Sequence, residues 1–236
     1  MIISEITGVK KWHHLTPDEV LEQLSEIYGL RVLGSGSFGK VIQIPGKNYV
    51  YKVFDNDDAY LSFVNYVMTH PDPHFPTFIK APRTMHSFYK RAPSEPNKFT
   101  IVGIEILYPI AQEKRQYVQW LLDVMQDISY NRFDITEWPA ELPNGDWNYK
   151  QIRYKDLMQM YPQMETLINS YTEMHQSQQI HGEEDLHLGN IMQRADGTIV
   201  IVDPVANHAQ VHKQMSRQNI PDIEKTITGP QYKSKT

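Results

Sequence analysis

The sequence predicts an α+β fold with two lobes, in which a strand-rich first half precedes a helix-rich second half. Short runs of β-branched and aromatic residues, separated by glycine and proline, fill residues 30–54 and recur at 99–106. From residue 117 onward, apolar residues recur mostly at helical spacing, with one late hairpin. Strands gathered in one half and helices in the other are typical of an α+β chain.

The first half begins with an expected helix, which starts at the capping sequence Thr16-Pro17-Asp18-Glu19 and ends at Gly29. Three short strands follow, the last two joined by the turn Pro45-Gly46-Lys47-Asn48. They cover residues 30–33, 41–44 and 49–54. A helix over residues 57–68 and a strand over residues 99–106 complete this half.

In the second half we expect a helix near residues 117–128 and a long helix over residues 157–177, which restarts at Pro162. Residues 131–149 are rich in proline, glycine and aspartate and indicate an irregular insertion. A hairpin of residues 190–192 and 199–202 follows. The expected domains are an N-terminal lobe (1–106), a reduced helical C-terminal lobe (107–211) and a basic, mobile tail (212–236).

Composition excludes several classes of protein. Hydrophobic residues make up 40% of the chain and charged residues 22%, which is an ordinary globular balance. The net charge of -5 argues against direct nucleic-acid binding by phosphate neutralisation. The chain has no cysteine, so disulfides and thiolate metal sites are excluded. Without a long apolar segment we expect no membrane partner and a cytoplasmic location.

The segment Gly34–Val41 fits the pattern G-x-G-x-x-G-x-V. Glycines let the backbone approach phosphates closely, although three glycines also make ordinary turns and dinucleotide-binding loops. A dinucleotide loop runs from a strand into a helix, whereas this segment joins two expected strands. The context therefore favours a flap over ATP. The expected nucleotide-binding residues are Gly34, Ser35, Gly36, Ser37, Phe38, Gly39 and Val41.

Lys52 lies in the middle of the third strand, between apolar residues. An isolated lysine at such a position usually faces solvent. After a glycine-rich loop, however, a lysine on the third strand is placed to contact the α- and β-phosphates.

The most specific segment runs from Ile180 to Met192 and is followed by Val202-Asp203-Pro204. Asp185 lies ahead of the hairpin, where a carboxylate can deprotonate an attacking hydroxyl. Asn190 at the start of the hairpin and Asp203 at its end can converge on Mg²⁺. Each residue alone could be a turn residue, but the three together at these offsets indicate a phosphotransfer site.

These motifs resemble those of the protein-kinase superfamily over roughly residues 30–205. The resemblance implies that Asp185 is the catalytic-loop aspartate, that Asn190 and Asp203 bind metal, and that Lys52 pairs with phosphate. It also implies that the Glu105 carbonyl and the Leu107 amide hold adenine, beside Ile104 as gatekeeper. The implied cofactors are ATP and Mg²⁺.

Within the superfamily, the segments around Asp185 and Asp203 look most like the early serine/threonine kinase of tailed bacteriophages. That family phosphorylates host proteins, including the transcription and translation machinery. The resemblance therefore implies protein substrates in the cytoplasm of a bacterial host, and self-phosphorylation.

Several residues depart from the superfamily pattern. Asp203-Pro204-Val205 replaces Asp-Phe-Gly, and Glu183-Glu184 replaces His-Arg, so we expect no activation by loop phosphorylation. His187 stands in place of the catalytic lysine that usually steadies the γ-phosphate in the superfamily, and we expect its imidazole to do part of that work. No glutamate follows Lys52 on the expected helix, and Asp58 is the substitute partner that we expect.

Two other functions remain open from the sequence. Asp-Leu-His-x-x-Asn also resembles aminoglycoside and choline phosphotransferases, which act on small molecules. A pseudokinase that only binds a partner is the third reading, although it has no physical need to retain Lys52, Asp185, Asn190 and Asp203 together.

Overall fold

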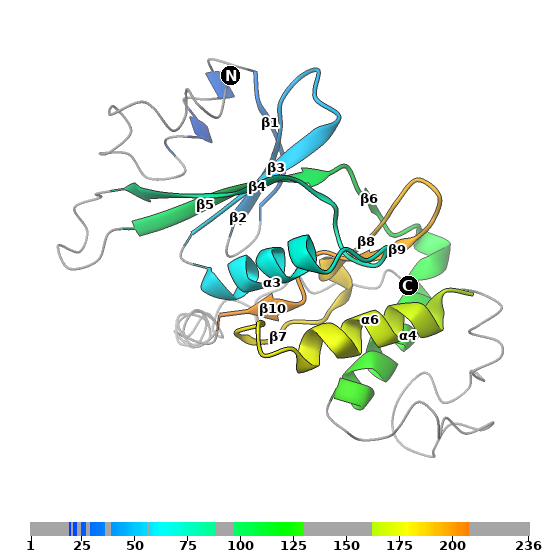
Figure 1. The fold of residues 1–236 in the computed structure, drawn as a ribbon. Coiled ribbons are helices and arrows are strands. Elements are labelled where there is room, and N and C mark those ends of the chain that lie inside the picture. The colour runs from blue at the N-terminus through cyan, green and yellow to red at the C-terminus, as the bar shows by residue number, and fades with distance from the viewer. Residues whose placement is uncertain are drawn as a thin grey trace, which may run out of the picture.

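The computed structural model describes residues 29–35, 39–55, 57–87, 97–129 and 162–207, together with positions 19, 21, 22, 25 and 26. Several expected features lie outside the described residues. They are the start of the first helix, Gly36, Ser37, Phe38, the insertion at 131–149, residues 157–161 of the expected long helix, and the tail at 212–236. The α+β class is confirmed by the remainder (Figure 1).

A five-stranded antiparallel sheet dominates the first half of the chain, with strand order β1-β2-β3-β5-β4. Its strands are β1 (Arg31–Ser35), β2 (Gly39–Gln43), β3 (Tyr49–Asp55), β4 (Phe78–Ser87) and β5 (Asn97–Glu105). Four of the five strands were expected from the sequence. The central strand β3 pairs with β2 on one side and with β5 on the other, so Lys52 lies between Val41 and Val102.

Strand β4 is the strand that the sequence did not predict. It contains Pro82 and several polar residues, and most of its described side chains are exposed. Proline is tolerated here because β4 is an edge strand, where one row of backbone N–H groups needs no partner. Two register irregularities between Phe78 and Arg83 accompany the proline. The strand propensity of these residues and their order of apolar and polar side chains therefore do not predict this strand.

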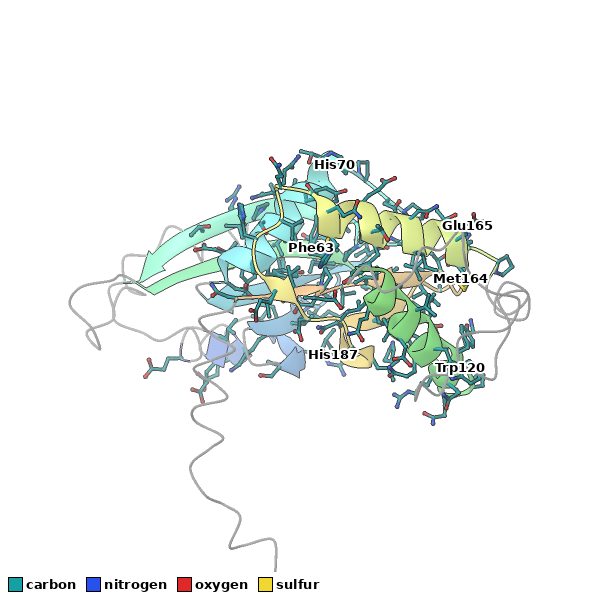
Figure 2. The ribbon with its side chains drawn as sticks, turned by 90° about the horizontal axis from the view of Figure 1, so that it is seen from below. Phe63, His70, Trp120, Met164, Glu165 and His187 are labelled. Atoms are coloured by element: carbon teal, nitrogen blue, oxygen red, sulfur yellow. The ribbon has the colours of Figure 1, made fainter. Side chains whose placement is uncertain are left out.

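Helix α3 (Asp58–Thr69) follows β3 directly, as the sequence predicted. The Asp57 side chain caps its first turn by accepting a hydrogen bond of 2.9 Å from the Tyr60 backbone N–H. The helix lies below the sheet in Figure 1, and its buried face includes Tyr60, Phe63 and Val67. Phe63 lies among the closely gathered side chains at the centre of the molecule (Figure 2).

The second half supplies two longer helices and several short strands. The helices are α4 (Arg115–Ser129), preceded by the 3₁₀ turn η2 (Gln112–Lys114), and α6 (Met164–Gln176). A three-stranded sheet is made of β6 (Tyr108–Pro109), β8 (Ile191–Gln193) and β9 (Ile199–Ile201). A smaller pair joins β7 (Glu183–Glu184) to β10 (Val205–Ala206), and η5 (Leu188–Asn190) precedes β8.

One hydrophobic core connects the sheet, α3, the helices and the hairpin. It contains Val50 and Val102 from the sheet, Leu121 from α4, Tyr171 from α6 and Ile201 from β9. Residues 106 and 107 link the five-stranded sheet to β6 and hence to the hairpin sheet. Within the described part of the chain, no helix is both long and apolar enough to cross a bilayer.

Two glycines of the glycine-rich segment differ in their packing, and this difference gives a test. A Cβ added to Gly39 would lie 2.5 Å from the Val53 carbonyl oxygen, whereas one added to Gly34 would meet no atom within 4 Å. We expect Gly39→Ala to lower the free energy of unfolding by about 1–3 kcal/mol through overpacking. Gly34→Ala should change it by less than about 0.5 kcal/mol. Urea unfolding of both variants measures this, and equal losses would contradict the packing of β2 on β3.

Candidate active site

Lys52 and Asp203 meet across 151 positions of sequence. The Lys52 Nζ lies 2.6 Å from the Asp203 Oδ2, and the two side chains are 12% and 25% exposed. Lys52 comes from the middle of β3, and Asp203 from the segment between β9 and β10. The contact therefore ties the centre of the large sheet to the loop after the hairpin.

The second neighbour of Lys52 is aromatic. Its Nζ lies 3.3 Å from the centroid of the Tyr60 ring, which is buried in the first turns of α3. Asp58, the partner that we expected from the sequence, is exposed at the start of the helix. The buried acidic residue is instead Asp57, whose carboxylate caps α3. The expectation for Asp58 is therefore replaced by the contacts of Lys52 with Asp203 and Tyr60.

Asp185 and Asn190 form the second part of the site. The Asp185 backbone N–H donates to the Pro204 carbonyl at 2.8 Å, beside the short β7–β10 pairing. The Asn190 Nδ2 donates to the Asp185 carbonyl at 2.7 Å and to its Oδ2 at 3.2 Å. These bonds hold the Asp185 carboxylate against the turn that enters the hairpin.

The backbone of Asn190 joins the same region to Asp203. Its N–H donates to the His187 carbonyl, and its own carbonyl accepts from the Val202 N–H, both at 2.9 Å. Asn190 is buried, and both of its side-chain hydrogen bonds use the amide nitrogen. The amide oxygen is therefore the atom of Asn190 that is available to ligate a cation.

His187 faces Asp185 with one ring nitrogen. Its Nδ1 accepts a hydrogen bond of 3.0 Å from the Gly189 N–H, and its Nε2 lies 3.6 Å from the Asp185 Oδ1. Because Nδ1 uses its lone pair as an acceptor, the ring proton of the neutral imidazole is on Nε2 and faces the carboxylate. The expected contact of His187 with a phosphate stays a prediction, and the structure adds its contact with Asp185.

Asp203 interacts electrostatically with two other carboxylates, those of Asp57 and Asp185, and with the ammonium group of Lys52. Burial raises the pKa of Asp203; the nearby Asp185 raises it further, whereas Lys52 opposes the shift. Burial also raises the pKa of Asp57, against the opposing hydrogen bond from the Tyr60 N–H, and Asp203 adds to the rise. The site therefore carries an excess of negative charge that a cation would offset.

The described residues of the glycine-rich segment form the β1–β2 hairpin. Gly34 pairs with Val41 and Ser35 pairs with Lys40, and all of β1 is exposed. Val41 also pairs with Lys52, so this hairpin lies next to the strand that carries the lysine. Gly39 has a packing role of its own against Val53, which the motif did not indicate.

Glu105 and Leu107 lie where β5 leaves the large sheet. Ile104 is buried in the core, Glu105 is the last residue of β5, and Leu107 precedes β6. The Glu105 backbone N–H donates to the Thr77 carbonyl at 3.0 Å. The expected adenine contacts concern the backbone of this connection and stay predictions.

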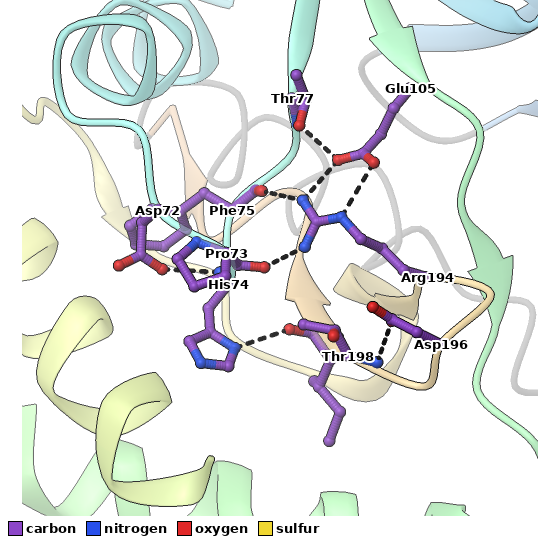
Figure 3. Close-up of polar contacts among 10 residues, drawn as sticks. Asp72, Pro73, His74, Phe75, Thr77, Glu105, Arg194, Asp196 and Thr198 are labelled. Atoms are coloured by element: carbon purple, nitrogen blue, oxygen red, sulfur yellow. Dashed lines mark hydrogen bonds and ion pairs between the residues drawn. The ribbon is translucent and has the colours of Figure 1, made fainter.

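The Glu105 side chain has a role that sequence reasoning missed (Figure 3). Arg194, in the turn after β8, donates to both Glu105 oxygens at 3.0 and 2.6 Å. The same guanidinium donates to the Pro73 and Phe75 carbonyls, and Glu105 also accepts from the Thr77 N–H at 2.7 Å. Arg194 thus joins β5, the loop after α3 and the hairpin. A single arginine in a turn gives no sequence signal for such a contact.

The loop after α3 is hydrogen-bonded to the hairpin on one side and to α6 on the other. His74 is fully buried; its Nδ1 lies 3.0 Å from the Ile199 carbonyl, and its own carbonyl accepts from the Ile201 N–H. Asp72 accepts a hydrogen bond of 2.7 Å from the Ser170 hydroxyl of α6. Burial lowers the pKa of His74, which favours the neutral ring. Helix α3 is therefore attached at its C-terminal end to both the hairpin and α6.

Among the described residues, no three histidine, aspartate or glutamate side chains gather into a metal site. Asp203 and the Asn190 amide oxygen are oxygen ligands of the kind that Mg²⁺ prefers. Mg²⁺ usually takes only one or two protein carboxylates and completes its shell with water and substrate phosphates. The residues present fit such an ion better than a site made by the protein alone.

Comparison of the sequence with models of protein families finds no match, and comparison with curated proteins finds none either.

The Arg194–Glu105 contact predicts a pH-dependent part of the stability. Burial alone would raise the pKa of Glu105, but the hydrogen bonds from Arg194 and Thr77 outweigh it and hold the pKa below its ordinary value of 4.5. The ionised Glu105 carboxylate therefore stabilises the fold above pH 4.5. This contribution to stability is lost as the pH falls through the pKa of Glu105 in the folded state, which is the lower of its two pKa values. At pH 7, Glu105→Gln should cost about 1–3 kcal/mol, because an amide N–H₂ replaces one acceptor.

Urea unfolding of wild type and Glu105→Gln at pH 7 and pH 3 tests this prediction. We expect the difference in unfolding free energy to shrink at the lower pH. The matched control is Glu113→Gln, a change at an exposed glutamate of η2. If the difference in unfolding free energy between wild type and Glu105→Gln is the same at both pH values, the contact is not ionic.

Proposed function

We propose that this chain is an ATP-dependent phosphotransferase of the serine/threonine protein-kinase type. The observation that carries the proposal is the 2.6 Å contact between Lys52 on β3 and Asp203 after the hairpin. The resemblance of the motifs predicted that these two residues act on one nucleotide, and no local pattern requires them to meet. The division into an N-terminal and a C-terminal lobe at residues 106 and 107 is part of the proposal.

The binding roles follow from the charges of the site. Lys52 is the cation placed to contact the nucleotide phosphates, and the Gly34–Val41 hairpin lies beside it. Asp203 and the Asn190 amide oxygen would hold Mg²⁺. When bound, this ion neutralises charge on the phosphates. Lys52 would then exchange its contact with Asp203 for one with phosphate.

Asp185 is the proposed base for the acceptor. Its carboxylate is 38% exposed, so a hydroxyl can approach it, and Asn190 holds it in place. As the acceptor oxygen bonds to the γ-phosphorus, the bond to the bridging oxygen breaks and ADP leaves. The acceptor proton passes to Asp185. The Nε2–H of His187 faces the same carboxylate and helps to orient it.

The class of acceptor rests on the motif resemblance, which points to proteins of a bacterial host. The exposure of Asp185 and of His187, at 38% and 57%, suits an acceptor that is presented on a protein surface.

Incubating the purified chain with labelled ATP and a bacterial lysate tests whether the acceptors are proteins. We expect labelled protein bands. Label on aminoglycoside or choline acceptors instead would support a small-molecule phosphotransferase, and nucleotide binding without any transfer would support a pseudokinase.

Removing the proposed base should abolish most turnover. We expect Asp185→Ala to lower kcat by about 100- to 10,000-fold, the usual contribution of general-base catalysis. The matched control is Asp196→Ala, which removes an exposed carboxylate from the β8–β9 turn and should keep kcat. Steady-state phosphate transfer by both variants measures the difference. Wild-type kcat in Asp185→Ala would show that another group takes the proton.

Weakening the metal ligand should be partly reversible. Asp203→Asn removes a negative charge and should raise the Mg²⁺ concentration needed for half-maximal transfer by about tenfold or more. Excess Mg²⁺ or Mn²⁺ should restore part of the rate, whereas it should not rescue Asp185→Ala. Titration of metal at fixed ATP checks this. An unchanged metal requirement in Asp203→Asn would exclude Asp203 as the ligand.

A further inference from the structure

We propose that Tyr60 is a positioning residue for Lys52, and that its ring takes the place of a carboxylate partner through a cation–π contact. This inference rests on the proposed function, because it concerns how Lys52 is held for a nucleotide. The Lys52 Nζ lies 3.3 Å from the Tyr60 ring centroid, well inside the distance of about 6 Å at which such contacts act. The contact is largely shielded from water, since Tyr60 is 1% exposed.

No acidic side chain of α3 is available for this task. Asp58 is the one acidic residue within the helix, and it is exposed. Asp57 is buried but caps the helix through the Tyr60 N–H. The direct contacts of Lys52 are therefore with one anion, Asp203, and with one neutral ring, while Asp57 attracts Lys52 from the helix cap without a hydrogen bond to it.

A neutral partner has a physical advantage at this site. Asp203 already interacts electrostatically with both Asp57 and Asp185. A further carboxylate next to Lys52 would repel these carboxylates and would offset part of the positive charge that attracts the phosphates. The aromatic face attracts the ammonium but leaves its full charge for the nucleotide.

The ring itself is rigidly placed. It packs edge-on to Phe54 of β3, with centroids 4.9 Å apart, and lies 5.9 Å from Phe63. Helix α3 is attached along its length to the segments that carry the site. The Ser62 hydroxyl accepts from the His181 N–H at 3.0 Å, and a Cβ at Gly182 would lie 2.7 Å from the Ala59 Cβ.

These contacts fix the position of the Tyr60 ring relative to β3. Tyr60 cannot leave Lys52 unless α3 separates from β3, from residues 181–182 and from the hairpin that His74 contacts. The Tyr60 ring therefore stays next to β3, and to Lys52, as long as α3 keeps these contacts.

The test replaces Tyr60 by phenylalanine and then by mono-, di- and trifluorinated phenylalanine. Each fluorine weakens the negative face of the ring while its size is nearly kept, so the variants should fold. Two quantities are measured: the Kd for Mg·ATP, and the fraction of Lys52 that a limiting amount of an amine-reactive ester modifies in the free protein. We expect Tyr60→Phe to resemble wild type and the series to weaken Mg·ATP binding stepwise, by about tenfold overall. Lys52 modification should rise in the same order.

The same series at Phe63 is the matched control. Phe63, labelled in Figure 2, is also a fully buried aromatic residue of α3. Its ring centroid lies 5.7 Å from that of Phe75. Fluorination there should leave Lys52 modification and Mg·ATP affinity unchanged. Lys52 modification that is flat along the Tyr60 series, or that rises equally along the Phe63 series, would overturn the proposal. Failure of the wild-type chain to bind Mg·ATP would instead refute the proposed function, since Lys52 modification is measured without nucleotide.

Discussion

The contact between Lys52 and Asp203 is the interaction on which the candidate site depends. It joins the middle strand of the large sheet to the loop that follows the hairpin, and it brings a cation among three carboxylates. Burying a charge is costly unless a partner compensates for it. The close approach of Lys52 and Asp203 therefore constrains where β3 and the β9–β10 segment lie relative to each other.

Two further sets of contacts support this geometry from either side. Arg194 joins the end of β5, the loop after α3 and the hairpin through one guanidinium. His74 and Asp72 attach the same loop to β9 and to α6. All these contacts surround a continuous apolar core, so the polar site is held by rigid elements. Rigid support of this kind is what a reaction based on positioning and charge stabilisation requires.

The sequence predicted much of the fold and most of the polar residues that the structure brings together. Strands β1, β2, β3 and β5 and helix α3 follow from alternation, caps and turn residues, which are local signals. Asp185, Asn190 and Asp203 follow from fixed offsets around a hairpin. Strand β4 could not be predicted from the sequence, because an edge strand tolerates Pro82 and polar side chains. The roles of Tyr60 and Arg194 could not be predicted either, because their contacts join residues that are distant in sequence and belong to no short motif.

We propose that Lys52, Asp185, Asn190 and Asp203 together transfer phosphate from ATP to proteins. The most direct test of this proposal is mass spectrometry of phosphorylated sites in bacterial cells that express the chain, beside cells that express Asp185→Ala at the same level. We expect phosphorylated serine and threonine sites on cellular proteins that appear with the wild-type chain and are absent with the variant. The same set of sites in both cultures, or no new site in either, would contradict it.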